Sequence, residues 1–182
     1  MMPGGFSCTS NGRIVLRLDE VERILLLSLC GQMVEMVAPE PADPDADPLA
    51  SAIGIDSAAV RPDDPVLMRL FPDAYSDDPD AANEFRRFTE RDLRQTKFDH
   101  ARGVQECLER SGSKLVLSVA LAPSWMGFLN DVRLALGVRI GIDDDFHDEV
   151  LDLDEDDPRM AMVGVYDWLT YLQDSLVQIM LP

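Results

Sequence analysis

Apolar residues recur at a spacing of three and four positions over most of the chain, which predicts a mainly α-helical protein. We expect helices at 20–37, 48–53, 64–71, 79–110, 123–137 and 158–181. The last of these is apolar nearly all round, which is typical of a helix at the centre of a bundle. The chain has 182 residues, a length that suits one helical domain over 1–182. The predicted fold class is therefore a helical bundle.

A small β-hairpin is expected before the first helix, because Asn11-Gly12 is a strong signal for a two-residue type I′ turn. In that register Cys8 faces Val15 and shares the face of Arg13 and Arg17, away from the core. The core-facing side then carries Ile14, Leu16 and Leu18. A short strand at 114–118 can join the hairpin and make the sheet three-stranded.

Residues that begin and end helices set the expected boundaries. Asp19 is suited to cap the first helix, and Pro39 ends it. Thr89 and Asp92 have the spacing of a capping box, so we expect a break or a bend near Thr89 that gives helices over 79–88 and 90–110. Gly137 is expected to end the helix that starts at Pro123.

The chain is strongly acidic. It has 34 Asp and Glu against 16 Lys and Arg, a formal charge of -18. The acids concentrate in two expected loops, at 38–48 and 141–157, and the second contains a run without Lys or Arg from 143 to 157. Such a field repels phosphate polyanions and attracts cationic surfaces, so it predicts a basic protein partner and no tight direct binding to nucleic acid. A calcium loop is disfavoured because Asp148 stands where the turn requires glycine.

The sequence contains no motif for a known reaction. It has no glycine-rich phosphate loop, nucleophile elbow or zinc-binding helix, and Cys107 lies two helical turns from His100, too far for a nucleophile pair. We therefore expect neither an enzyme nor a cofactor or metal site. The apolar stretches 24–30 and 160–165 are too short to span a bilayer, and no export signal is visible, so the expected location is the cytoplasm.

Charged residues on predicted buried faces form a candidate polar network. Asp167 and Asp174 are seven residues apart on the last helix and share a face. They are either a catalytic carboxylate pair or partners for arginines of neighbouring helices, and the second interpretation is the commoner one. The candidate network consists of Arg94, Asn130, Arg133, Asp167 and Asp174.

Several short motifs, taken in order, resemble one known family. They are Asp73-Ala-Tyr75, Glu84-Phe-Arg-Arg87 with Thr89, Asp92-Leu-Arg94 with Lys97, Leu129-Asn-Asp-Val-Arg-Leu134 with Leu136-Gly137, and Tyr166-Asp-Trp-Leu169 with Leu172-Gln173. From Ile14 to the C-terminus the chain is similar to an actinobacterial family designated as a domain of unknown function. The resemblance implies small acidic cytoplasmic proteins encoded near the Clp protease adaptor and a sulfur-carrier route to cysteine. One branch comprises oxidation-sensing transcription regulators that work through an alternative sigma factor.

The resemblance and the charge together predict a non-enzymatic regulatory protein that acts through protein contacts. The implied partner is a basic protein such as a sigma factor or a polymerase subunit. The alternative is an adaptor or accessory factor for Clp proteolysis or sulfur-carrier chemistry. The family supplies no catalytic residues to carry over, and an oligomer is left open.

The implied redox function makes Cys8 and Cys30 the candidate thiol pair, because they are close in sequence across the hairpin and the first helix. Cys30 lies opposite the polar stripe of Ser28, Gln32 and Glu35, so we expect it to be buried. Cys8 is expected on the other side of the sheet. A disulfide between them then requires movement, and the alternative is that both are ordinary cysteines.

Overall fold

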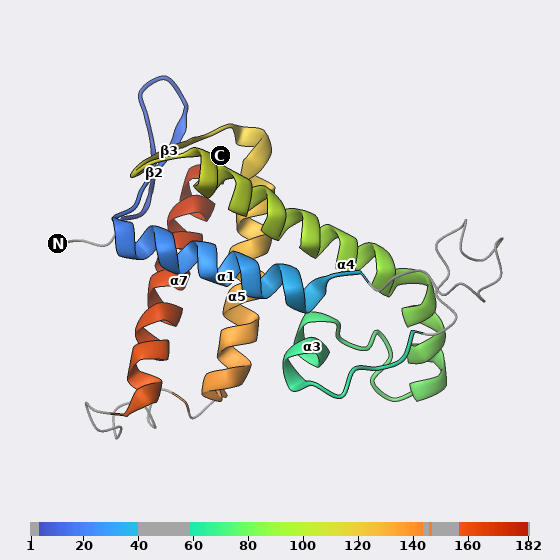
Figure 1. Cartoon of the computed structure of the whole chain (residues 1–182). Coiled ribbons are helices and arrows are strands. Elements are labelled where there is room, and N and C mark those ends of the chain that lie inside the picture. Colours follow the sequence, from blue (N-terminus) through green and yellow to red (C-terminus); the bar gives the residue numbers. More distant parts are fainter. Residues whose placement is uncertain (1–3, 40–58, 144–145, 147–156, 182) are drawn as a thin grey trace.

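The computed structural model describes residues 4–39, 59–143, 146 and 157–181. The predicted helix at 48–53 and most of both acidic loops lie outside these ranges. The elements are β1 (Phe6–Cys8), β2 (Ile14–Arg17), α1 (Glu20–Val37), α3 (Pro65–Leu70), α4 (Pro79–Arg110), β3 (Lys114–Leu117), the 3₁₀ turn η1 (Val119–Leu121), α5 (Ala122–Ile140) and α7 (Pro158–Met180). Figure 1 shows the helices crossing one another with the sheet at one end. A mainly helical fold with a small N-terminal hairpin is confirmed.

The hairpin loop has three residues, not the predicted two. The amide of Thr9 donates to the Arg13 carbonyl and the amide of Gly12 donates to the Thr9 carbonyl, each at 2.9 Å. Only Gly12 has positive φ, at 75°, so the loop is not the type I′ turn that needs two such residues. Cys8 consequently pairs with Ile14, one position away from the predicted Val15.

The third strand is confirmed, and β3 pairs antiparallel with β2. Leu115 and Leu117 stand opposite Leu16 and Ile14, and all four side chains are buried, as the alternation of the strands requires. The sheet closes one end of the hydrophobic core, where the Phe6 and Trp125 rings meet edge to face at 5.4 Å.

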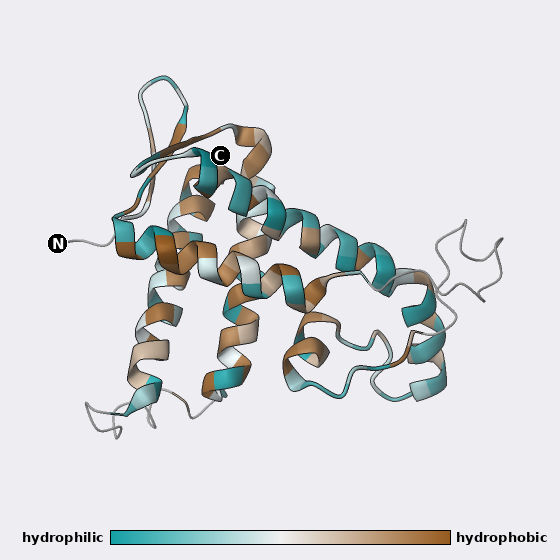
Figure 2. Cartoon of the chain, viewed as in Figure 1, coloured by the Kyte–Doolittle hydropathy of each residue, from teal (hydrophilic) through white to brown (hydrophobic). Residues whose placement is uncertain are grey.

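The predicted limits of α1 are confirmed. Asp19 accepts a hydrogen bond from the Glu22 amide, and the Glu22 carboxylate accepts one from the Asp19 amide, both at 2.8 Å. This reciprocal capping box satisfies two backbone donors at the helix start. The helix ends at Val37, before Pro39, and packs along α4. Figure 2 shows apolar residues concentrated on α1 and hydrophilic residues along the outer side of α4.

Helix α4 is continuous from Pro79 to Arg110, so the predicted break at Thr89 is wrong. The Thr89 hydroxyl donates to the Phe85 carbonyl one turn earlier, at 3.0 Å, rather than capping a new helix. Such a backward bond is compatible with a helix and tends to bend it. In Figure 1 the N-terminal part of α4 is indeed turned relative to the rest, so the bend forms and the break does not.

Helix α5 continues past Gly137, where we predicted its end. It stops at Ile140, because Gly141 adopts the left-handed conformation with φ of 76° and caps the helix. The Ile142 amide then donates to the Gly137 carbonyl at 2.9 Å. Gly137 itself is buried inside the helix.

Helix α7 occupies the outside of the bundle, so its predicted central position is wrong. Only one side is buried, through Val163, Leu169, Leu172 and Leu176. Tyr171 and Met180 remain exposed on the other side. The central helix is α5, which packs against α3, α4 and α7. No helix in the described ranges is both long and apolar enough to cross a membrane.

Candidate functional site

The two cysteines of the predicted redox pair have opposite environments. Cys8 is exposed, although the register places it on the Ile14 side of the hairpin and not, as predicted, with Arg13 and Arg17. Cys30 is fully buried, as predicted. Burial raises the pKa of the Cys30 thiol to about 12, and the nearby charges of Glu109 and Cys107 add to this effect. Cys30 is therefore a protonated, unreactive thiol near neutral pH.

The third cysteine, Cys107, is the thiol that the fold brings near Cys30. It lies on α4, partly buried against the same core, where α1 and α4 pack together. Burial raises its pKa, while the indole N–H of Trp125 and the charge of Arg110 partly oppose the increase. Sequence reasoning missed this neighbour because Cys30 and Cys107 belong to helices that are distant along the chain.

The candidate polar network is not assembled as one unit. Asn130, Asp167 and Asp174 are exposed, and neither arginine is paired with an acid of α7. Arg133 does reach α7, where it donates to Thr170 at 2.9 Å and to Gln173 at 2.5 Å. Its guanidinium also lies 5.2 Å from the centre of the Tyr166 ring. Arg133 of α5 thus contacts α7 through neutral side chains of that helix.

Arg94 belongs to a different, largely buried charge cluster on α4. Arg86 is 5 % exposed and donates to Glu90, to the Phe71 carbonyl at 3.0 Å and to Asp73 at 2.7 Å. Burial alone lowers the pKa of Arg86, but its bonds to Asp73 and Glu90 outweigh burial and raise it. Arg94 donates to Glu90 at 2.8 Å and stacks over the Phe71 ring at 4.4 Å from its centre.

Each charge of this cluster has an opposite partner. Glu90 lies between two arginines, and Asp73 binds both Arg86 and Arg61. A second buried pair, between Lys97 and Asp131 at 2.6 Å, then joins α4 to α5. Charges that are paired and hydrogen-bonded tolerate burial, and such forked arginine contacts fix geometry. The cluster therefore holds the loop before α4 and the first half of α4 in one arrangement.

Three aromatic side chains are exposed directly beside the charge cluster. Phe85 and Phe88 lie on α4, and Tyr75 lies in the preceding loop. They are 45 %, 52 % and 51 % exposed. The rings of Tyr75 and Phe85 meet edge to face at 6.0 Å. We call these three residues the aromatic strip.

The aromatic strip was not predicted from the sequence. The helical spacing of the residues could have predicted which of them are exposed. Ala82, Arg86 and Glu90 form the buried side of this part of α4, and Phe88 falls on the opposite side. No group of three or more His, Cys, Asp and Glu with the geometry of a metal site occurs among the residues that the structure describes.

Comparison with known proteins finds one family model and several relatives that carry the name of a regulator. The family model described as "Domain of unknown function (DUF2017)" matches residues 3–180. The chain is 33 % identical over 174 residues to the oxidative stress regulator AosR of Mycobacterium tuberculosis, covering 88 % of this chain and 78 % of the relative. It is also 33 % identical over 186 residues to the putative oxidative stress regulator AosR of Mycobacterium leprae, covering 93 % and 83 %. No solved structure matches significantly.

Proposed function

Because this chain belongs to the DUF2017 family, we propose that it is a regulator of the oxidative stress response that acts through protein contacts and not by catalysis. The observation that carries this proposal is the similarity to relatives named oxidative stress regulators, which extends over most of both chains. The motifs that resemble the family lie on α4, α5 and α7 and in the loop before α4, and they form no constellation of catalytic type among the described residues.

The charge of the chain supports a basic protein as the partner. A formal charge of -18 opposes the approach of DNA and favours cationic protein surfaces. A sigma factor or a polymerase subunit with a basic surface therefore fits the molecule better than a promoter does. In this proposal the chain influences transcription by binding the transcription apparatus.

The environments of the thiols support Cys8 as the group that meets an oxidant first. It is exposed, whereas Cys30 is buried and its pKa is about 12. In the reaction the Cys8 thiolate attacks hydrogen peroxide, an S–O bond forms, the O–O bond breaks, and a sulfenic acid and hydroxide result. The modified side chain stands at the end of the hairpin, where a partner can detect it without unfolding of the core.

A deletion strain complemented with single-cysteine variants tests the proposal. The deletion should alter the set of transcripts induced by peroxide, and the wild-type gene should restore it. Cys8→Ser should fail to restore the peroxide response, whereas Cys30→Ser should restore it if the variant folds. An unchanged peroxide transcriptome in the deletion strain contradicts the regulatory function.

Binding experiments with purified proteins test the partner separately. The chain, immobilised in reduced and peroxide-treated form, should retain a sigma factor or core polymerase of its host in low salt and release it at high salt. Tight, sequence-selective binding of the purified chain alone to promoter DNA in moderate salt contradicts the assignment of a protein partner.

A further inference from the structure

The first half of α4 places its side chains in an unusual order. Charged residues point inward, where Arg86 and Glu90 are 5 % and 8 % exposed. Phenylalanine points outward, since Phe88 is 52 % exposed on the side opposite Glu90. A solvent-facing helix normally has the reverse order, with apolar residues inside and charges outside. The arrangement leaves an apolar surface uncovered while ionic groups occupy the interior.

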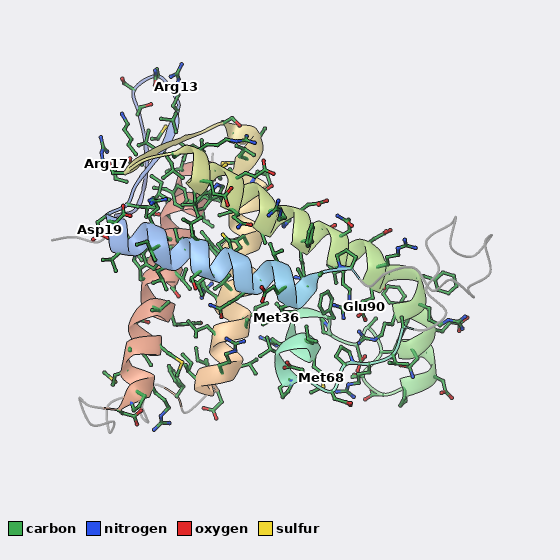
Figure 3. The ribbon with its side chains drawn as sticks, in the orientation of Figure 1. Arg13, Arg17, Asp19, Met36, Met68 and Glu90 are labelled. Carbon is green, nitrogen blue, oxygen red and sulfur yellow. The ribbon has the colours of Figure 1, made fainter. Side chains whose placement is uncertain are left out.

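The exposed aromatic residues are neighbours on a backbone that the charge cluster holds in place. Phe85 and Phe88 are one turn apart on α4, and Tyr75 contacts Phe85 from the preceding loop. Beneath them Arg86 binds both the loop, through Asp73 and the Phe71 carbonyl, and the helix, through Glu90. A side-chain surface that is held before binding loses less entropy when a partner docks. Figure 3 labels Glu90, the carboxylate of this cluster that binds both Arg86 and Arg94.

In the stretch of chain that carries the aromatic strip, exposed acids outnumber exposed arginines. From residue 75 to residue 99, the exposed acids are Asp77, Asp78, Asp80, Glu84, Asp92 and Asp99. Exposed arginines in the same stretch are Arg87 and Arg91, and neither forms an ion pair with a described residue. The surface thus combines aromatic faces with excess carboxylate, which is complementary to a cation and repels an acidic partner.

We infer that the aromatic strip, Tyr75, Phe85 and Phe88, with its surrounding carboxylates, is the surface on which α4 docks an arginine-bearing segment of a basic partner protein. Guanidinium groups stack on aromatic faces and pair with carboxylates through the same planar group. Arginine and aromatic residues are also the types enriched at the energetic centres of interfaces. The inference rests on the proposed function, because it places the basic partner on one surface of the molecule.

A labelled peptide provides a defined probe. The peptide is a 20-residue amphipathic helix with arginine at every third or fourth position, and its lysine and glutamate versions serve as comparisons. Binding to the full-length chain is measured by fluorescence anisotropy in about 0.1 M salt, and the binding surface is mapped from amide chemical shifts. The arginine peptide should bind more tightly than the lysine peptide, and the glutamate peptide should not bind.

Matched variants separate the aromatic strip from the general acidity of the chain. Phe85→Gln with Phe88→Gln should weaken binding of the arginine peptide about tenfold. Asp167→Asn with Asp174→Asn removes two exposed carboxylates on α7 and should change the affinity for the arginine peptide less than twofold. Val21→Gln with Ile24→Gln removes two exposed apolar side chains on α1 and should also have little effect.

Three results overturn the inference. Equal weakening in all three double variants means that binding follows total charge or apolar area. Chemical-shift changes confined to other elements place the interface elsewhere. The wild-type chain can also form a concentration-dependent dimer that is lost in the phenylalanine double variant. That result means that a second copy of the chain, and not a basic partner, binds the aromatic strip.

These results differ from a failure of the proposed function. If the peptide binds at the aromatic strip but the deletion strain responds normally to peroxide, the proposed regulatory function is contradicted and the docking surface is supported. The deletion can instead alter the peroxide response while the phenylalanine double variant binds the peptide normally and complements the strain fully. In that case only the proposed docking surface is contradicted.

Discussion

The two halves of α4 bury opposite kinds of side chain. The second half buries Ala101, Val104 and Leu108 against α1 and α5, and beyond Lys97 none of its charged residues is buried. The first half buries Arg86 and Glu90 and leaves phenylalanine in solvent. Both halves belong to one continuous helix, so the difference does not come from secondary structure.

The difference shows which half of α4 contributes most to the stability of the hydrophobic core. Apolar burial stabilises a fold in proportion to the area removed from water, and the second half provides it. A buried ion pair is a weak source of stability, because desolvation offsets most of its attraction. It does hold geometry, since each guanidinium must meet its carboxylate at a fixed angle. The first half is thus built for a defined surface and the second for stability.

The largest expected effect comes from breaking the buried cluster. Glu90→Ala leaves Arg86 and Arg94 without their shared carboxylate, and we expect a loss of about 3–5 kcal/mol in the free energy of unfolding. Urea unfolding followed by circular dichroism measures it. Glu106→Ala, which breaks an exposed pair with Arg110 in the second half, is the control and should cost below about 1 kcal/mol. Similar losses in both variants would remove the distinction between the halves.

The second half should be sensitive to loss of volume. Leu108→Ala removes a fully buried side chain, and we expect a loss of about 3 kcal/mol in the free energy of unfolding, from lost burial and the cavity left behind. Leu93→Ala, at a partly exposed position of the same helix, should cost below about 1 kcal/mol. A small effect at Leu108 would mean that the α1–α4 contact contributes little to the core.

Alkaline pH probes the same contact through Cys30. Its pKa is raised from about 9 to about 12 in the folded state, so folding favours the neutral thiol. The stabilisation is fully present below pH 9 and is lost between pH 9 and 12, at about 1.4 kcal/mol per pH unit. Cys30→Ala should therefore flatten the decline of stability over this range, while Cys8→Ala should leave it unchanged. Identical pH profiles for wild type and Cys30→Ala would contradict the buried, protonated thiol.

The smallest effect is expected on the aromatic strip. Phe85→Gln and Phe88→Gln each remove an exposed ring that packs little against the core, so the free energy of unfolding should change by less than about 0.5 kcal/mol. Urea midpoints of the single variants measure this directly. A loss above about 2 kcal/mol would show that the rings support the fold and would weaken the case for a docking surface.

Local chemistry was sufficient to predict most elements. The cap at Asp19, the stop before Pro39 and the start at Pro158 act within a few residues, so they can be predicted from the chain alone. The alternation of Ile14, Leu16 and Leu18 predicted the buried face of the hairpin for the same reason. The burial of Cys30 followed from its position opposite a polar stripe.

Where the same residues allow two local conformations, the sequence did not decide between them. Asn11-Gly12 is compatible with a two-residue and a three-residue loop, and of these two residues only Gly12 takes positive φ. The Thr89 hydroxyl can cap a helix or bond back to Phe85, and the continuous helix uses the second option. Gly137 and Gly141 can both end α5, and the later one does.

The chain by itself determined where helices and strands form, because caps, prolines and periodicity act over one or two turns. Only the tertiary structure decided which faces are covered, since exposure depends on neighbours that are remote along the chain. It placed Asp167 and Asp174 of α7 in solvent, and it put Cys107 beside Cys30. It also gave the inward position on α4 to Arg86 and Glu90, because Asp73, Phe71 and Arg94 were there to satisfy them.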